Sequence, residues 1–149
     1  MACEFKMIHR VEFADTDLAG LIHFAKYLRF MEVTEHAFFR SLGFSILMWD
    51  AFKVGWPRVA VECSFSEPVR FEDELEARLL VREMKSRSIT YDFLFRRIKP
   101  KPVIEVARGS MTAVCVSRDP ATMKMRAVPI PKAIASRIET APSAKGGAR

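Results

Sequence analysis

The sequence predicts an α+β fold in which an antiparallel sheet of about five strands wraps around one long central helix. The first observation is a single stretch of helical periodicity over residues 24–42. The second is a series of later segments in which apolar and polar residues alternate, as they do in half-buried strands. The third is that the connections between these segments are short enough to require antiparallel neighbours. A helix and a sheet with one apolar face each are expected to bury those faces against each other.

The chain begins with a strand-like segment over residues 3–13, and the turn-rich sequence ADTDLAG follows it. The helix predicted over residues 24–42 would be about 28 Å long. Its apolar stripe consists of Phe24, Leu28, Met31, Phe38 and Leu42, spaced as one face of a helix requires. Gly43 follows at once and predicts the end of the helix.

Four strands are predicted after the helix, over residues 59–65, 75–81, 89–95 and 103–116. The segment KSRS, residues 85–88, joins the second of these strands to the third as a tight hairpin, and KPKP, residues 99–102, joins the third to the fourth. Gly109 interrupts the last strand and predicts a bulge or kink. A short terminal helix is expected over residues 131–139.

We expect a single domain over residues 1–140 and a disordered C-terminal tail over residues 141–149. The length of 149 residues falls within the usual range of one domain. Half of the residues are apolar, which is enough to build a core for a chain of this size. The tail has the sequence APSAKGGAR, whose small and polar residues are typical of an unstructured terminus.

The composition narrows the class of protein further. No apolar run approaches the ~18 residues needed to span a bilayer, and the opening sequence MACEFKMIHR lacks the apolar region of a signal peptide. The three cysteines, Cys3, Cys63 and Cys115, are far apart and odd in number, which fits neither a disulfide framework nor a zinc spacing. We therefore expect a cytoplasmic protein with no membrane partner.

The net charge of +6 is concentrated near the C-terminus. Residues 118–149 contain seven Lys and Arg against two acidic residues, whereas the rest of the chain contains seventeen against sixteen. A nucleic-acid-binding protein would present a basic face with aromatic or groove-reading elements, and the nearly neutral body does not. We expect no nucleic-acid partner, although a small polyanion such as a nucleotide-bearing cofactor needs only a few local charges.

Two carboxylates, Asp15 and Asp17, lie where the first strand gives way to the helix. A helix N-terminus has unpaired N–H groups and a positive dipole end, which favour an ionised carboxylate by about 0.3–1 kcal/mol. The same N–H groups can polarise a carbonyl oxygen, and losing such a donor costs on the order of 100-fold in rate. This corner of the fold can supply both a base or nucleophile and an oxyanion site. A plain helix cap is the structural alternative for Asp17.

The segment FADTDLAGLIHFAKYLRFMEVTEHAFF, residues 13–39, resembles the signature of hotdog-fold acyl-CoA thioesterases, specifically the 4-hydroxybenzoyl-CoA thioesterase branch. That branch has an acidic turn, a glycine three residues on, and aromatic residues on the first turns of the central helix. The order of strand, helix and strands matches over about residues 5–130. The resemblance implies hydrolysis of an aromatic, short or medium acyl-CoA to the free acid and CoA, with no cofactor besides the CoA of the substrate.

The resemblance also implies residue roles. Asp17 corresponds to the catalytic carboxylate, which attacks the thioester carbonyl or activates a water molecule, and the backbone N–H of Phe24 corresponds to the oxyanion donor. Gly20 would let the backbone turn close to the substrate, and Tyr27 would line the acyl pocket. His23 departs from the family pattern, in which Tyr or Trp is common at this position. It would contact the acyl group, orient a water with Asp17, or serve as a buried structural histidine.

Other carboxylates near the corner are expected to have lesser roles. Asp15 is expected to hold the loop that carries Asp17. Glu32 and Glu35 lie further along the helix, where other hotdog lineages place their catalytic carboxylate, but Asp17 already fills that role. No ligand spacing compels a metal site from Asp15, Asp17 and His23, so no metal is predicted.

The KSRS hairpin matches a basic turn that holds the phosphates of CoA in the family, which assigns Lys85, Arg87 and Ser88 to CoA binding. An ordinary solvated hairpin is the alternative. Trp56 and Pro57 lie in the region that closes the acyl pocket of the partner subunit in the family. The resemblance therefore implies active sites across a dimer interface, in a homodimer or in a homotetramer paired through its sheets.

Three other functions remain open at this stage. The first is a hotdog protein that acts on an acyl-carrier-protein thioester. Dehydratases of that kind rely on a histidine with an acid on the helix, where this chain has the isolated His36. The second is a non-catalytic acyl-CoA-binding module, although no second domain is evident to receive a signal. The third is a basic nucleic-acid binder, which strongly salt-dependent binding would support.

Overall fold

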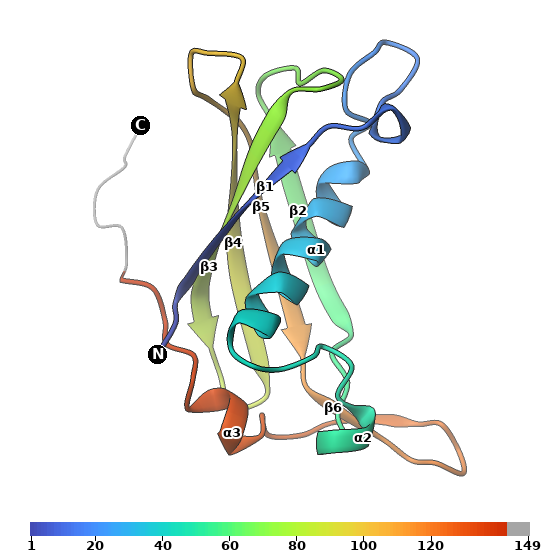
Figure 1. Ribbon diagram of the computed structural model, residues 1–149. Helices are drawn as coiled ribbons and strands as arrows, with labels where there is room; N and C mark the ends of the chain where they lie inside the picture. Colours follow the sequence, from blue (N-terminus) through green and yellow to red (C-terminus); the bar gives the residue numbers. More distant parts are fainter. Residues whose placement is uncertain (143–149) are drawn as a thin grey trace.

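The computed structural model describes residues 1–142, and Figure 1 shows an antiparallel sheet crossed by one long helix. The strands are β1 (Glu4–Arg10), β2 (Arg58–Phe65), β3 (Glu74–Met84), β4 (Ser88–Lys99), β5 (Ile104–Val114), β6 (Val116–Arg118) and β7 (Met125–Ala127). The helices are α1 (Lys26–Ser41), α2 (Trp49–Phe52) and α3 (Lys132–Ala135), and the 3-10 turn η1 spans Phe13–Asp15. The sheet order is β1-β3-β4-β5-β2, which confirms the predicted α+β class.

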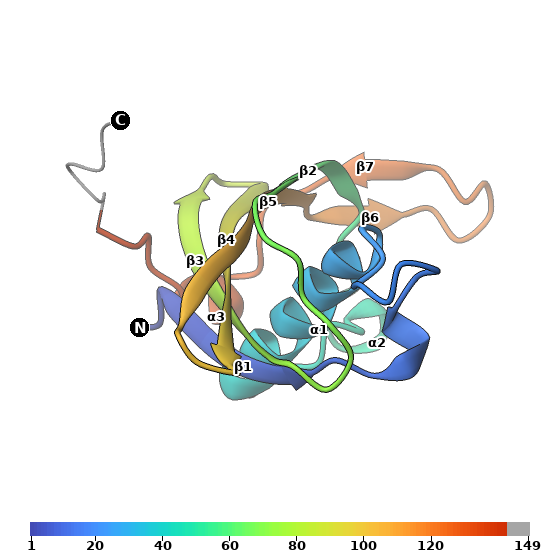
Figure 2. The same cartoon turned by 90° about the horizontal axis from the view of Figure 1, so that it is seen from above.

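The core lies between α1 and the inner face of the sheet, which curls around the helix in Figure 2. The helix residues Met31, Phe38 and Phe39 are completely buried. Phe38 packs edge-on against Tyr91 of β4, with ring centroids 6.5 Å apart, and it also contacts Phe5 of β1. Each fully buried side chain of this size contributes about 1.5–3 kcal/mol relative to exposure, so this contact fixes the helix on the sheet.

Helix α1 is shorter than the sequence predicted. Residues 23–25 form single turns instead of the first helical turn, since the N–H of Lys26 donates to the carbonyl of His23 at 2.9 Å and that of Tyr27 to the carbonyl of Phe24 at 3.3 Å. The side chain of Phe24 is consequently 65% exposed, and that of Leu28 is also exposed. The first part of the predicted apolar stripe therefore faces an open cleft, not the core.

Gly109 does not form the predicted bulge. It pairs in regular register with Cys63 of β2 and Phe93 of β4. A Cβ atom at this position would lie 2.9 Å from the carbonyl oxygen of Glu62 and would also meet the terminal methyl of Met31, so a larger residue would require β2 and the flexible Met31 side chain to shift. The first strand also ends earlier than predicted, at Arg10, and a 3-10 turn follows.

The hairpins at residues 85–88 and 99–102 connect β3 to β4 and β4 to β5 as predicted. The sequence did not predict the hairpin of β6 and β7, in which Val116 pairs with Ala127 and Arg118 with Met125. This hairpin extends away from the main sheet beyond β2 in Figures 1 and 2. The short terminal helix expected over residues 131–139 is present as the four residues of α3.

Strand β2 forms an open edge of the sheet. It pairs only with β5 among the strands of residues 1–142, and nearly all of its residues are exposed. Val61 and Phe65 point to the helix side of the sheet yet are 47% and 50% exposed. Long exposed edges with apolar residues are templates for pairing with another chain, which makes β2 a candidate interface.

The end of the described chain is attached to the sheet. The N–H of Ala141 donates to the carbonyl of Val81 at 2.8 Å. A disordered tail was predicted over residues 141–149, and residues 143–149 of it lie outside the part of the chain that the structure describes. Over the part of the chain that the structure covers, none of the helices is both long and apolar enough to cross a membrane.

Candidate active site

Asp17 lies in a tight loop between η1 and α1. Its Oδ1 atom accepts hydrogen bonds from the backbone N–H groups of Ala19 at 2.8 Å and Leu21 at 3.3 Å. Gly20 has a φ of +76° and donates its N–H to the carbonyl of Asp17 at 3.0 Å, so the glycine provides the left-handed conformation that closes the turn. A bridge from Leu21 to Arg70 attaches the loop to the segment between β2 and β3.

The second carboxylate oxygen of Asp17 remains free. No hydrogen bond to Oδ2 is found within residues 1–142, and the side chain is exposed. The N–H of Phe24 likewise has no acceptor in this part of the chain, because the helix begins only at Lys26. Asp17, which has a free carboxylate oxygen, and Phe24, which has a free N–H, are both among the residues that line one cleft at the start of α1.

That cleft has a volume of about 380 Å³ and separates the start of α1 from the end of β2. Its lining residues are Asp17, Leu21, Ile22, Phe24, Tyr27, Phe65, Ser66, Glu67, Pro68 and Val69. Most of these residues are apolar, and Asp17, Ser66 and Glu67 are the polar ones. This is the usual arrangement of a small-molecule site, in which apolar surface binds and a few polar groups orient the ligand.

Tyr27 forms the floor of the cleft and is only 4% exposed. Its ring lies 5.2 Å from the rings of Phe65 and of Phe95. Burial raises the pKa of the Tyr27 phenol well above its ordinary value, so this hydroxyl is neutral and can only donate or accept a hydrogen bond. The alternation of residues 59–65 placed Phe65 on the helix side, but the sequence did not identify it as a cleft residue.

His23 lies on the other side of Asp17, in an open hollow lined also by Phe13, Leu18 and Phe24. Its Nδ1 atom accepts a hydrogen bond from the N–H of Ala25 at 3.1 Å, and its ring stacks on Phe24 with centroids 4.5 Å apart. No hydrogen bond to the Nε2 atom of this ring is found within residues 1–142. His23 is half-buried at the surface, so it is not the buried core histidine that the sequence left open.

Asp15 holds the loop, as expected. Its Oδ2 atom accepts a hydrogen bond from the N–H of Glu12 at 2.9 Å, and its Oδ1 lies 3.9 Å from the ammonium of Lys26.

The two helix glutamates form ion pairs. The fully buried carboxylate of Glu35 pairs with Arg58. Glu32 lies 3.9 Å from His36 and 3.1 Å from Arg29. No cluster of side chains suited to a metal ion occurs within residues 1–142.

The residues assigned to CoA phosphates lie far from Asp17 in the same chain. Lys85, Arg87 and Ser88 form the β3–β4 turn, which is fixed to the base of the β6–β7 hairpin because Arg87 accepts a hydrogen bond from the N–H of Cys115 at 2.8 Å. Figure 1 places this turn and the Asp17 loop at opposite ends of the sheet. Strands of this length span about 35 Å, so one chain does not bring the two groups together.

Trp56 and Pro57 also lie at the end of the sheet opposite to Asp17. Trp56 is 5% exposed and packs on Phe39, and its indole N–H donates to the sulfur of Met48 at 3.2 Å. Pro57 is half-buried immediately before β2. Neither residue lines the Asp17 cleft of its own chain.

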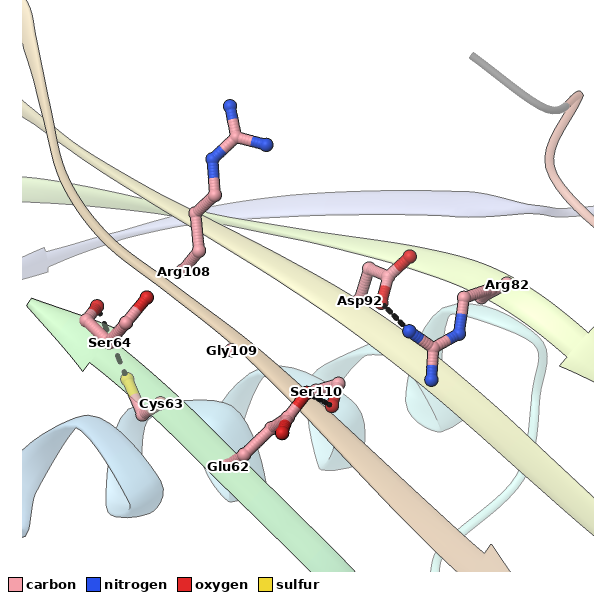
Figure 3. Close-up of a pocket in the computed structure, with 8 residues that line it drawn as sticks. All are labelled: Glu62, Cys63, Ser64, Arg82, Asp92, Arg108, Gly109 and Ser110. Carbon is pink, nitrogen blue, oxygen red and sulfur yellow. Dashed lines mark hydrogen bonds and ion pairs between the residues drawn. The ribbon is translucent and has the colours of Figure 1, made fainter. Parts of the chain in front are cut away.

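A second hollow of about 310 Å³ lies on the outer face of the sheet, away from α1 (Figure 3). Each of its charged side chains has a polar partner, and that of Arg108 is Glu105, which does not line the hollow. Arg82 contacts Asp92 at 2.9 Å, and the hydroxyl of Ser110 donates to Glu62 at 3.1 Å. Burial raises the pKa of the Cys63 thiol, which also lines this hollow, to about 11, so this nucleophile is almost entirely protonated at neutral pH.

The antiparallel sheet wrapped around one long helix defines a hotdog fold. The model of the thioesterase-like superfamily matches residues 11–138, and the chain belongs to that superfamily. A match to a relative from Aquifex aeolicus spans 57% of this chain and 66% of the relative.

Two further relatives match over nearly the whole domain. The acyl-CoA thioester hydrolase YbgC of Escherichia coli is 28% identical over 84% of this chain and 90% of its own length. The 4-hydroxybenzoyl-CoA thioesterase of Pseudomonas sp. strain CBS-3 is 25% identical over 88% of this chain and 94% of its own length. The solved structure of the latter aligns with a TM-score of 0.81 over 91% of this chain and 99% of that chain, at 23% identity in the structural alignment.

Proposed function

We propose that the protein is an acyl-CoA thioesterase in which Asp17 is the catalytic carboxylate and the N–H of Phe24 stabilises the oxyanion. The observation that carries this proposal is the shared cleft at the start of α1, where the Oδ2 atom of Asp17 and the N–H of Phe24 both lack partners within residues 1–142. An unpaired carboxylate oxygen and an unpaired N–H beside apolar side chains are the kind of polar groups that orient a ligand in a small-molecule site, which supports a ligand-binding role.

The reaction has two possible courses at this geometry. In the first, Asp17 attacks the thioester carbonyl, the C–S bond breaks, CoA leaves as the thiolate, and water then hydrolyses the mixed anhydride. In the second, Asp17 removes a proton from a water molecule that attacks the carbonyl directly. Both develop negative charge on the carbonyl oxygen, and the N–H of Phe24 would donate to it. His23 is proposed to orient a water molecule, because it lines a hollow that Asp17 also lines.

The cleft supports an aromatic or short-to-medium acyl group. Tyr27, Phe65 and Val69 provide flat and apolar walls, and the volume of about 380 Å³ lies near the lower end of the range for small-molecule pockets. The relatives named for 4-hydroxybenzoyl-CoA and for acyl-CoA esters agree with this range of substrates. No cofactor is proposed besides the CoA of the substrate, and the three separated thiols agree with a cytoplasmic setting.

The active unit is proposed to be a dimer formed through β2, with a homotetramer as its possible assembly. Lys85, Arg87 and Ser88 lie at the wrong end of the sheet to reach a substrate at Asp17 of the same chain. An antiparallel pairing of two β2 edges reverses one sheet relative to the other. It brings the β3–β4 turn of one copy to the same end as the Asp17 loop of the other, where Lys85 and Arg87 would bind the CoA phosphates.

A thiol-release assay tests the proposal. Benzoyl-, 4-hydroxybenzoyl-, naphthoyl-type, acetyl-, hexanoyl- and palmitoyl-CoA are compared with wild-type protein and with Asp17→Asn, and Asp50→Asn on α2 serves as a matched control for loss of one exposed carboxylate. We expect hydrolysis that falls by a factor of about 100 or more in Asp17→Asn and is unchanged in Asp50→Asn. Turnover near wild type in Asp17→Asn would overturn the assignment. No hydrolysis of any ester by wild-type protein would favour a carrier-protein thioester or a binding module.

A further inference from the structure

An exposed apolar groove continues from the Asp17 cleft between α1 and β2. Leu28 and Glu32 follow Phe24 at intervals of one helical turn and therefore lie on one face of the helix. On β2, Val61 and Phe65 point to the same side of the sheet, because alternate residues of a strand share a face. Strand β2 runs alongside α1 in the opposite direction (Figure 1), so the two rows of side chains form the walls of one groove.

The far part of this groove is a pocket of about 200 Å³. It is lined by Leu28, Glu32, Arg58, Val61 and Met111. Arg58 is the first residue of β2, whereas Phe65, which lines the Asp17 cleft, is the last. The pocket and the cleft therefore occupy the two halves of the groove, and the apolar side chains of Leu28 and Val61 lie between its ends.

Arg58 places hydrogen-bond donors at the far end of the groove. Its guanidinium donates to the carbonyl of Trp56 at 2.8 Å and pairs with the carboxylate of Glu35. A guanidinium has more N–H donors than these two contacts use, and no further acceptor for it is found within residues 1–142. The Arg58 side chain keeps 30% of its exposure and lines the pocket, so its remaining donors are available to a ligand in the groove.

Glu32 places an acceptor at the same end. Its Oε2 atom accepts a hydrogen bond from Arg29 at 3.1 Å, whereas its Oε1 atom accepts none within residues 1–142 and lies 3.9 Å from the ring of His36. A free acceptor beside free donors matches a hydroxyl group, which can both donate and accept. A ligand carboxylate would be repelled by Glu32, because the charge of Arg58 is already balanced by Glu35.

Two buried polar atoms next to the lining residues lack partners. They are the Oε2 atom of Glu35 and the hydroxyl of Tyr91, and neither forms a hydrogen bond within residues 1–142. Glu35 is the partner of Arg58, and Tyr91 lies opposite Met111 in the register of β4 and β5. Buried polar groups are normally paired, so the chain leaves hydrogen-bonding capacity unused at this end of the groove.

The distance between the two ends sets the length of the ligand. Phe24, whose N–H is the proposed oxyanion donor, and Glu32 are about 12 Å apart along the helix axis. An extended chain advances about 1.2 Å per bond, so about ten bonds join a carbonyl carbon at Phe24 to a hydroxyl at Glu32 and Arg58. A single aromatic ring would fill only the first part of the groove and leave Leu28 and Val61 uncovered.

We propose that the acyl chain of the substrate lies in this groove, and that Glu32 and Arg58 select an unbranched acyl group of about ten carbons that ends in a hydroxyl. This inference rests on the proposed thioesterase function of Asp17. The chain is held by burial against Leu28 and Val61, and the hydroxyl provides the discrimination. In a dimer through β2, the second copy lies along the same edge of the sheet and would cover the open side of the groove.

The first test concerns chain length. Thiol release is measured with acetyl-, hexanoyl-, decanoyl- and palmitoyl-CoA for wild type and for Leu28→Trp, whose indole fills the groove between its two ends. We expect kcat/KM of wild type to be highest for decanoyl-CoA, and the ratio of decanoyl- to acetyl-CoA to fall about tenfold or more in Leu28→Trp. Ile8→Trp, which adds the same side chain to the exposed outer face of β1, is the matched control and should keep the wild-type ratio. The same ratio in Leu28→Trp as in wild type would overturn the inference.

The second test concerns the polar end. Decanoyl-CoA is compared with ω-hydroxydecanoyl-CoA and with ω-carboxydecanoyl-CoA, and we expect kcat/KM of wild type to be about tenfold or more higher for the hydroxylated ester and lowest for the carboxylated one. Glu32→Gln should raise kcat/KM for the carboxylated ester relative to the other two. Glu35→Leu with Arg58→Met removes the cation without leaving a buried carboxylate unpaired, and it should abolish the preference for the hydroxylated ester. Circular dichroism checks that each variant is folded.

The outcomes separate this inference from the function on which it rests. Hydrolysis of the esters without a preference for the hydroxylated one would overturn the inference and leave the thioesterase function intact, as would an undiminished preference in the folded double variant. If wild-type protein hydrolyses none of the esters, the thioesterase function fails first, and calorimetry with decanoyl-CoA and ω-hydroxydecanoyl-CoA still tests the groove. Equal affinity of wild type for these two esters, or equal affinity of wild type and Leu28→Trp for decanoyl-CoA, would then refute it.

Discussion

The buried ion pair between Glu35 and Arg58 predicts an asymmetric response to mutation. Glu35 is completely buried, and its Oε2 atom has no hydrogen-bond partner within residues 1–142, while its Oε1 atom pairs with Arg58. Arg58 retains 30% of its side-chain exposure, and it also donates to the carbonyl of Trp56 at 2.8 Å. The carboxylate therefore depends on its partner, whereas the guanidinium has access to water.

The two single variants should differ in cost for this reason. Breaking a buried pair by removing one partner costs about 3–5 kcal/mol when the remaining charge stays buried. Arg58→Met leaves the carboxylate of Glu35 buried, so we expect a loss of about 3 kcal/mol, toward the lower end because Arg58 is partly solvated. Glu35→Leu leaves Arg58, which can turn toward water, and we expect a loss of about 1 kcal/mol. The double variant should resemble Glu35→Leu, because two apolar residues replace the pair.

Urea unfolding measures these differences, and an unchanged m-value shows that the midpoint shift reports stability. Arg29→Met is the matched control, because Arg29 pairs with Glu32 on the exposed face of the same helix. Its loss should cost no more than about 0.5 kcal/mol. If Glu35→Leu destabilises the protein as much as Arg58→Met, or if both cost less than about 1 kcal/mol, the carboxylate does not depend on Arg58 and the reasoning fails.

Three further predictions concern the loop and the titrating groups. Gly20→Ala introduces a side chain at a φ of +76°, so it should lower the free energy of unfolding by about 1 kcal/mol and lower turnover by displacing Asp17. Thermal melting and thiol release measure the two effects, and an unchanged melting temperature contradicts the prediction. Burial holds the pKa of His9 below its usual 6.5, so the unfolded chain binds a proton at this residue first as the pH falls. Stability should therefore decrease as the pH drops below about 6.5. Urea midpoints should show a smaller decrease for His9→Phe than for wild type. Burial raises the pKa of Cys63 and of Cys115 to about 11, so roughly one thiol in a thousand is ionised at pH 8. Iodoacetamide should label both slowly in the folded state and quickly in urea, and rapid labelling of the folded protein would contradict their burial.

The periodicity of the sequence was enough to predict the sheet and its helix. The alternation of residues 75–81 and 89–95 corresponds to the buried faces of β3 and β4, and the short KSRS and KPKP connections required the antiparallel order. Gly109 was misinterpreted because a glycine within a strand indicates either a bulge or a close approach. The contacts that a Cβ atom would make here come from Glu62 and Met31, both distant in the sequence, and such distant contacts leave no local signal.

The candidate site was predicted in part. The loop around Asp17 could be located because an Asp followed by Gly20 and a helix forms a local motif. The structure adds that the Oδ2 atom of Asp17 and the N–H of Phe24 have no hydrogen-bond partner within residues 1–142. The wall contributed by Phe65 was not predicted, because its position depends on how β2 lies against α1. The β6–β7 hairpin was also missed, since its strands have three residues each and are too short to show a period.

The open edge at β2 provides the last prediction, which tests whether one chain is sufficient for activity. Val61 lies near the middle of β2 on the helix side and is 47% exposed. In an antiparallel pair of β2 edges, the central residues of the two strands face each other. Val61→Lys would therefore place two ammonium groups close together, and like charges in such positions destabilise strand pairing.

We expect Val61→Lys to remain folded but to elute as a monomer, and to lose most of its activity on acyl-CoA because the second copy no longer completes the site. Ile8→Lys is the matched control, because Ile8 is 56% exposed on the outer face of β1 and lies at the opposite edge of the sheet. That variant should keep the assembly and activity of wild type. Size-exclusion chromatography with light scattering and thiol release, both measured over a dilution series, decide the matter. A monomeric Val61→Lys with full activity would show that the groups of one chain around Asp17 are sufficient, and the roles proposed for Lys85 and Arg87 of a second subunit would then be withdrawn.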